Sequence, residues 1–385
     1  MTARNGREIP SEARPVNLAL QGGGAHGAFT WGVLDRLLED QRVVIEAISG
    51  TSAGAMNAVV LVDGLMSGGT EGARAKLRQF WEAVGAASRY TLLQRGPLSV
   101  LTQNWSLDLS LGYYLFDTIT RSLSPYEFNP LNINPLKDIL ERTVDFDLVR
   151  SCEKLKLFIS ATNVETGRVR VFARDTLTAD MVMASAALPI LFQAVEIEGK
   201  YYWDGGYMGN PVLFPLSYAK TSRDIVIVQI NPIEREGVPK TAHEILNRIN
   251  EISFNASLLH ELRSIDFVRR MLTTHHIAPD HQEMLIHIID GQEALSSLSA
   301  SSRFNPERAF LEHLFEIGRK AADDWLNTHY DCLGERSSVD VRRLFQGDGY
   351  ELEAAAMPMA IPPRPAAKRF LSRAAQYARR VLPRP

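Results

Sequence analysis

The sequence has few cysteines and no long apolar run, and both absences narrow the class of protein. Cys152 and Cys332 are far apart and form no C-x-x-C motif, so no disulfide framework is indicated, as suits a reducing compartment. No stretch approaches the roughly eighteen uninterrupted apolar residues of a membrane-spanning helix. Residues 1–15 are polar and lack the apolar run and cleavage site of a signal peptide. We therefore expect a cytoplasmic protein.

Acidic residues are absent from the segment 357–385, although the whole chain carries a net charge of −3. This segment contains seven basic residues: Arg364, Lys368, Arg369, Arg373, Arg379, Arg380 and Arg384. Residues 1–356 therefore carry a net charge of −10. An acidic body argues against a nucleic-acid-binding surface, whereas the basic tail suits contact with a polyanion.

Strand-like and helix-like apolar patterns alternate along the chain. Strands are expected at 16–20, 43–49, 155–164, 168–173, 195–203, 224–231 and 285–289. Helices are expected at 27–40, 53–66, 178–187, 241–273 and 306–328. Such alternation predicts an α/β fold with a largely parallel sheet that is covered by helices on both faces.

Three consecutive glycines follow the first expected strand, in the stretch GGGAHG (22–27). Glycines between a strand and a helix turn backbone N–H groups outward at the positive end of the helix, so the loop suits a negatively charged group. The stretch also satisfies the G-x-G-x-x-G pattern of dinucleotide sites, but those sites need an acidic residue at the end of the second strand. Here that strand leads into GTSAG instead.

Gly50, Thr51, Ser52, Ala53 and Gly54 form the pattern G-x-S-x-G between an expected strand and an expected helix. This is the pattern of a nucleophile elbow, in which small neighbours permit a tight turn that exposes the serine Oγ. The two loops leave adjacent strand ends on the same side of a parallel sheet, so the glycine N–H groups can face the serine. Donors in that position stabilise the oxyanion of an acyl-transfer intermediate. The sequence thus favours acyl-transfer chemistry.

A serine nucleophile needs a base, and the best candidate is Asp204. It ends a run of bulky residues and is followed by Gly205 and Gly206, which let the backbone turn at once. The alternative for this Asp-Gly pair is a turn without a catalytic role. No downstream histidine lies in a short glycine-rich loop after a strong strand, so we interpret these residues as surface or helix-packing histidines. They are His243, His260, His275, His276, His281, His287, His313 and His329.

Four motifs together resemble the patatin-like phospholipases. They are GGGAHG, GTSAG, MASAALPILFQAVEI (183–197) and DGG, in this order, with 152 residues between the serine and the aspartate. The resemblance covers about residues 16–231 and implies a three-layer α/β/α domain with a Ser–Asp dyad. It implies that Ser52 is the nucleophile, that Asp204 is the base and that the oxyanion hole is formed by the N–H groups around three glycines. These are Gly22, Gly23 and Gly24.

His26 departs from the family pattern, because many relatives have Lys or Arg at this position. A fixed positive charge beside the glycine loop is therefore absent, or is present only when His26 is protonated, and we expect a small activity transition near its usual pKa of about 6.5. Asp204 with an ordinary pKa would be a weak base, so we expect Tyr202, Trp203 and Tyr207 to desolvate it and raise its pKa. Activity should rise as Asp204 ionises.

The chemistry implied by the dyad needs no metal and no other cofactor, and acidic clusters with the spacing of a calcium loop are absent. The expected function is hydrolysis of lipid or related acyl esters. The substrate could be a phospholipid, a glyceride, a thioester or a polyester, since all would use the same dyad. The alternative is a non-catalytic lipid-binding or scaffold protein that keeps the fold.

The expected organisation places a flexible segment (1–15) before the catalytic domain (16–231), with a mostly helical part (232–333) packed on that domain. An insertion at about 86–136 interrupts the regular alternation. Its aromatic and aliphatic residues are too dense for a solvated loop, so we expect them to pack on the domain or to line an acyl-chain groove.

A linker (334–367) leads to a basic amphipathic helix at 368–385, whose apolar and basic residues separate onto two sides. Such a helix can lie on an anionic membrane surface, which would place the enzyme at the inner face of the membrane. It can instead pack on the acidic body or on a second subunit, giving a homo-oligomer, or form a disordered tail.

Overall fold

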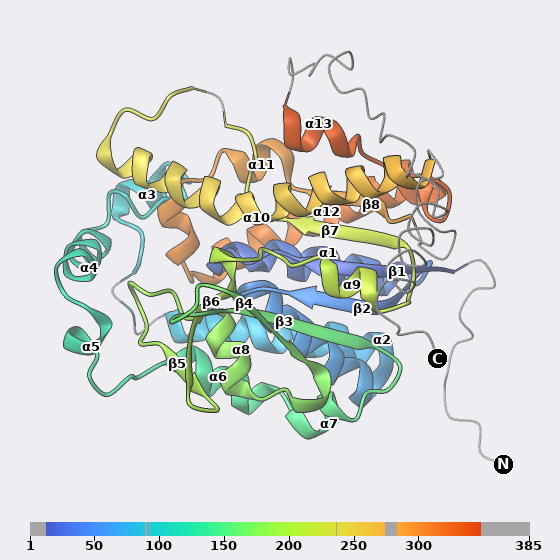
Figure 1. Ribbon diagram of the computed structural model, residues 1–385. Helices are drawn as coiled ribbons and strands as arrows, with labels where there is room; N and C mark the ends of the chain where they lie inside the picture. Colours follow the sequence, from blue (N-terminus) through green and yellow to red (C-terminus); the bar gives the residue numbers. More distant parts are fainter. Residues whose placement is uncertain (1–12, 89–90, 92, 236, 274–282, 348–385) are drawn as a thin grey trace, which may run out of the picture. The chain divides into compact units, whose positions relative to one another are not determined.

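The computed structural model describes residues 13–88, 91, 93–235, 237–273 and 283–347 (Figure 1). The expected amphipathic helix at 368–385 and much of the expected linker lie outside the described residues. Within them, no helix is long and apolar enough to cross a bilayer.

The described strands form one eight-stranded sheet with the order β5-β6-β3-β2-β1-β7-β8, and β4 also pairs with β3. The parallel strands are β1 (Arg14–Leu20), β2 (Val43–Gly50), β3 (Lys156–Asn163), β7 (Asp224–Gln229) and β8 (Leu285–Asp290). The antiparallel strands lie at one edge and are β4 (Val169–Ala173), β5 (Val195–Ile197) and β6 (Lys200–Asp204). Leu20 pairs with Gly50 across β1 and β2, so the glycine loop and the elbow leave the sheet at the same level.

Each face of the sheet has its own hydrophobic core. Successive side chains of a strand point to opposite faces, so Leu18 and Leu20 of β1 join one core while Ala19 joins the other. The first core is shared with α1 (Gly27–Asp40), α2 (Ala53–Ala87), α8 (Ala179–Ser185) and α12 (Arg308–His329). The second is shared with α9 (Phe214–Tyr218), α10 (Ala242–Thr273) and α13 (Val341–Gln346). The expected three-layer α/β/α arrangement, with its largely parallel sheet, is confirmed.

The strands and helices expected between residues 16 and 328 are present among the described residues, with three differences. The strand expected at 195–203 is a hairpin, because the chain turns at Glu198 and Gly199 with positive φ values of 53° and 73°. The helix expected at 53–66 continues to Ala87 after a break at Gly68 and Gly69. The expected insertion contains the short helices α3 (Pro97–Leu101), α4 (Leu111–Ser122) and α5 (Pro125–Phe128), and α6 (Pro135–Thr143) and α7 (Phe146–Arg150) follow it before β3.

Candidate active site

Ser52 occupies a sharp turn between β2 and α2. Its backbone has φ 54° and ψ −121°, a conformation that costs energy for a residue with a side chain and that persists where the surroundings enforce it. The turn is tied to β1, because the Thr51 N–H donates to the Leu20 carbonyl at 3.2 Å. A Cβ on Gly54 would lie 2.2 Å from that same carbonyl oxygen, so no larger residue fits there. The elbow pattern is therefore required by the approach of two adjacent strands.

The glycine loop lies directly against this turn. A Cβ on Gly22 would lie 2.5 Å from the Ser52 Cβ, so only glycine allows the loop to pass the nucleophile so closely. The Gly22 N–H, however, donates to Asn210 Oδ1 at 2.6 Å. In this structure the Gly22 N–H is therefore engaged by Asn210 and is not free to donate to an oxyanion. The N–H groups of Gly23 and Gly24 have no partner among the residues that the structure describes, so they remain the candidate donors.

Asn210 and Asn231 hold the loop in place. The Gly22 carbonyl accepts hydrogen bonds from Asn231 Nδ2 at 2.8 Å and from Asn210 Nδ2 at 3.3 Å. Gln21 adds a further anchor, since its Oε1 accepts the N–H groups of Ile230 and Asn231, each at 2.9 Å. Sequence reasoning missed these residues, although Asn210 closely follows DGG and Asn231 is the last residue of the strand expected at 224–231.

Ser185 connects a further motif to the elbow. It ends α8 in the stretch 183–197, is fully buried, and its Oγ accepts the Ser52 N–H at 2.9 Å. The neighbouring Thr51 hydroxyl lies 2.6 Å from Ser160 Oγ and donates to the Gly209 carbonyl at 2.8 Å. The elbow is thus fixed by side chains from β3 and α8 and by a backbone carbonyl from the turn after Asp204.

Asp204 is the last residue of β6 and lies almost fully buried beside Ser52. Its Oδ1 accepts the Gly206 N–H at 2.7 Å. Its Oδ2 has no hydrogen bond of normal geometry within the described part of the chain, although the Ser52 hydroxyl is close enough to act on the carboxylate. Burial raises the pKa of Asp204 to about 7, while the Gly206 N–H and the Ser52 hydroxyl oppose that rise. The expected increase in basicity is confirmed.

The expected neighbours of Asp204 are only partly correct. Tyr207 does interact with it, because burial and the Asp204 carboxylate raise the pKa of Tyr207 to about 12. Tyr202 packs instead against Phe172, with ring centroids 5.5 Å apart. Sequence reasoning missed Phe254 of α10, which lies against Gly206 and the Tyr207 ring. Because Phe254 is far from Asp204 in the sequence, no local pattern indicated this contact.

His26 is buried in the short helix η1 (Gly24–His26), and its Nε2 lies 2.8 Å from Ser302 Oγ. Ser302 Oγ donates to the Ser299 carbonyl at 2.6 Å, so His26 Nε2 carries the proton of their shared hydrogen bond. Burial and the charges of Arg303 and Arg235 hold the pKa of His26 well below its usual value. The expected transition near 6.5 is therefore wrong, since His26 stays neutral around and above that pH.

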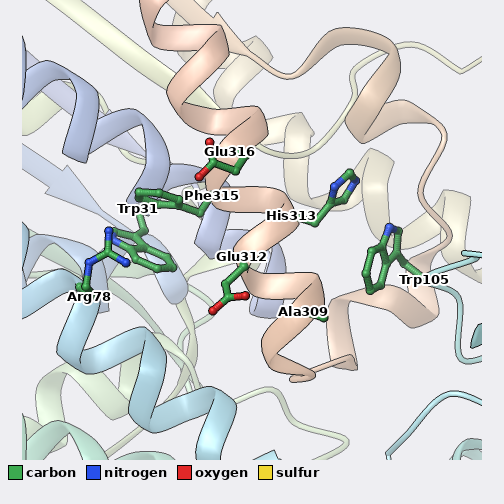
Figure 2. A pocket seen from close by; sticks show the side chains of 8 residues that line it. All are labelled: Trp31, Arg78, Trp105, Ala309, Glu312, His313, Phe315 and Glu316. Atoms are coloured by element: carbon green, nitrogen blue, oxygen red, sulfur yellow. The ribbon is translucent and has the colours of Figure 1, made fainter.

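A pocket of about 540 Å³ lies elsewhere, between α1, α2 and α12 (Figure 2). The Arg78 guanidinium lies 5.6 Å from the Trp31 ring centroid, and Trp105 stacks on His313 at 5.2 Å. Its lining residues include none from the elbow, the glycine loop or the Asp204 turn, so it is separate from the candidate active site. Among the described residues, no group of three or more His, Cys, Asp or Glu side chains is arranged to hold a metal ion.

One family model and several solved structures match this chain. A search of curated proteins finds no match. Among solved structures, VipD from Legionella pneumophila is 16% identical, with 83% of this chain and 67% of that chain covered and a TM-score of 0.36. ExoU from Pseudomonas aeruginosa, solved with SpcU, is 15% identical, with coverage of 80% and 53% and a TM-score of 0.29, so the chain spans about half of ExoU. The family model described as patatin-like phospholipase matches residues 18–219, which include both the elbow and the Asp204 turn. The chain therefore belongs to the patatin-like phospholipase family, whose members are lipid acyl hydrolases.

Proposed function

We propose that this protein hydrolyses carboxylic esters of phospholipids or related lipids through a dyad of Ser52 and Asp204. The proposal depends most on one observation: a serine in a strained elbow lies beside a buried carboxylate whose pKa is raised to about 7. A base with this pKa is suited to accept a proton near neutral pH, whereas a solvated aspartate is not.

In the first step, Ser52 Oγ attacks the carbonyl carbon of the ester and its proton passes to Asp204. Oδ2 is the oxygen suited to accept this proton, because Oδ1 already accepts the Gly206 N–H. The negative charge that develops on the carbonyl oxygen would be stabilised by the N–H groups of Gly23 and Gly24.

The tetrahedral intermediate collapses when the bond to the leaving alcohol breaks and Asp204 returns its proton to that alcohol. The acyl group then remains on Ser52. In the second half, water attacks the acyl-enzyme, Asp204 accepts a proton from the water, and Ser52 takes that proton back as the carboxylic acid leaves. Each proton that Asp204 accepts is returned in the same half-reaction, so the dyad is regenerated.

A fluorophosphonate probe tests the nucleophile directly. We expect the full-length protein to be labelled at Ser52 and the Ser52→Ala variant to remain unlabelled, with loss of hydrolysis of a short soluble ester. Asp204→Asn should retain the fold and lose most of both signals. Labelling of Ser52→Ala at another serine would contradict the assignment. A wild-type protein that is inert to the probe yet binds lipid would instead favour the non-catalytic alternative.

A further inference from the structure

Helix α4 presents an apolar stripe to the outside of the molecule. Leu111, Tyr114, Leu115 and Ile119 follow one another at helical spacing, and all four are exposed, Tyr114 by 67%. These four side chains do not pack on the domain. Trp105, Tyr113 and Phe116 of the same insertion do pack on it, as expected. An exposed run of large apolar side chains on one helix face is unusual for a surface that meets only water.

The inner side of α4 packs toward the glycine loop. Tyr113 and Phe116 contact Phe304, with ring centroids 6.4 and 6.0 Å away. Phe304 ends the short helix η5 (Ala300–Phe304), whose Arg303 carbonyl would lie 2.5 Å from a Cβ on Gly24. One packed helix therefore separates the apolar stripe of α4 from the candidate oxyanion donors.

A second apolar stripe lies on the first half of α10. Ile245, Ile249 and Ile252 are exposed and follow one another at helical spacing. The next turn of the same helix carries Phe254, which lies against Gly206 in the turn after Asp204. Phe254 is buried, so it lies on the opposite side of α10 from the exposed stripe. The width of one helix therefore separates this stripe from the Asp204 turn, as packed residues separate the α4 stripe from the glycine loop.

Both stripes lie at the end of the sheet where the catalytic loops leave it. The α3–α5 segment gathers at this end in Figure 1, beyond the ends of β1 and β2. We refer to the two stripes together as the apolar rim, defined as Leu111, Tyr114, Leu115, Ile119, Ile245, Ile249 and Ile252.

We propose that the apolar rim is the surface with which this enzyme enters an uncharged or zwitterionic lipid surface, so that Ser52 meets its ester at the interface. This inference rests on the proposed function. Aliphatic side chains together with tyrosine suit the boundary between headgroups and acyl chains. Each of the two stripes lies on the outer side of an element that packs on a catalytic loop. This placement favours the substrate phase itself over an unrelated protein partner.

The charge pattern favours a lipid surface without net charge. The segment 97–133 contains only Asp108, Asp117, Arg121 and Glu127 as charged residues. Asp117 and Arg121 form an ion pair at 2.7 Å, which leaves little charge to attract an anionic membrane. Insertion should therefore depend on apolar contact and be insensitive to salt, unlike the attraction expected of the basic tail.

The test compares two rim variants of the full chain with a matched control. One combines Leu111→Gln, Leu115→Gln and Ile119→Gln, and the other combines Ile245→Gln and Ile249→Gln. The control is Phe267→Gln, also exposed and on α10 but about 25 Å further along the helix, at about 1.5 Å per residue. Each protein is measured for sedimentation with phosphatidylcholine vesicles, hydrolysis of those vesicles and hydrolysis of a short soluble ester, at low and high salt.

We expect both rim variants to lose vesicle binding and vesicle hydrolysis by on the order of tenfold or more. Hydrolysis of the soluble ester should change by less than about twofold, which also reports that the fold is intact. Vesicle binding and hydrolysis at wild-type levels in the rim variants would overturn the inference. It would also be overturned if the wild type were a dimer in ultracentrifugation and the rim substitutions only converted it to a monomer. A wild type inactive on both substrates would instead contradict the proposed function.

Discussion

Gly22 and Ser52 approach each other so closely that a methyl group on the glycine would lie 2.5 Å from the serine Cβ. It would also lie 2.8 Å from the Thr51 carbonyl oxygen. These neighbours are a rigid backbone and the Cβ of a strained residue, so neither can move aside without displacing the nucleophile. The first glycine of GGGAHG is therefore needed so that the loop can pass close to Ser52, whichever group its N–H binds.

Gly22→Ala should consequently reduce kcat/KM for a soluble ester by about 100-fold, because small displacements of a reacting group carry such costs. Gly68→Ala is a suitable control, since a Cβ there meets nothing within 4 Å and the backbone φ is −160°. Its activity should stay within about twofold of wild type. A Gly22→Ala enzyme with normal activity would show that the loop can move away from Ser52.

The pH dependence of hydrolysis should follow Asp204. The base accepts a proton only when it is ionised, so kcat/KM should rise with pH, with a midpoint near the raised pKa of about 7. We expect no second transition from His26, because its pKa lies well below the usual value. Rates on a soluble ester between pH 4 and 9 test this. A midpoint near 4 would mean that Asp204 is solvated in the working enzyme.

The same raised pKa predicts how Asp204 affects stability. Between the ordinary value of 3.8 and about 7 the folded state binds a proton that the unfolded state has lost, so its free energy of unfolding falls as the pH rises. Asp204→Asn cannot ionise and escapes this loss. The free energy of unfolding of the variant, relative to that of wild type, should therefore rise by up to about 4 kcal/mol between pH 4 and pH 8, at about 1.4 kcal/mol per pKa unit. Urea unfolding at both pH values measures the gain; an equal difference at both would contradict it.

Much of the fold could be predicted because its strands carry unambiguous local patterns. Asp224–Gln229 is buried at every position, as expected of a strand inside a parallel sheet. The hairpin at Glu198 and Gly199 was missed because the apolar pattern continues on both sides of the turn. The helices within the insertion were missed because α3 and α5 are short and depend on capping and packing more than on a repeating pattern.

The candidate dyad was predictable because each of its residues carries a local turn motif. The groups that hold those residues were not, since their partners come from distant parts of the chain. Ser185 contacts Ser52 across 133 positions, and Asn210 contacts Gly22 across 188. The burial of His26 was equally hidden, because it depends on Ser302 and Arg303 of a segment with no motif of its own.

His26→Arg should destabilise the protein, although the family resemblance led us to expect a basic residue at this position. The guanidinium would enter a buried position where the charges of Arg303 and Arg235 already disfavour a cation. We expect a loss of about 3 kcal/mol or more in the free energy of unfolding. His26→Gln keeps a donor for Ser302 Oγ and should lose much less. If His26→Arg proves as stable as wild type, the loop must rearrange to expose the new side chain.

Asn210 and Asn231 both bind the backbone of Gly22, but only Asn210 accepts its N–H group. Variants of the two asparagines can therefore separate the anchoring of the loop from the binding of the Gly22 N–H. Asn210→Ala leaves the buried Gly22 N–H without its acceptor and removes one donor to the Gly22 carbonyl. Asn231→Ala removes the other donor and leaves the N–H bonded. An unsatisfied buried group costs about 1–3 kcal/mol, so Asn210→Ala should lower kcat/KM by about 10- to 100-fold and Asn231→Ala by less.

Thermal unfolding of both variants distinguishes a displaced loop from an unfolded protein. A displaced loop lowers the activity and leaves the melting temperature close to that of wild type. If Asn210→Ala were more active than wild type, the freed Gly22 N–H would be donating to the oxyanion, and Gly22 would return to the set of donors beside Gly23 and Gly24. Equal losses in the two variants would place the effect on the Gly22 carbonyl, which both asparagines share.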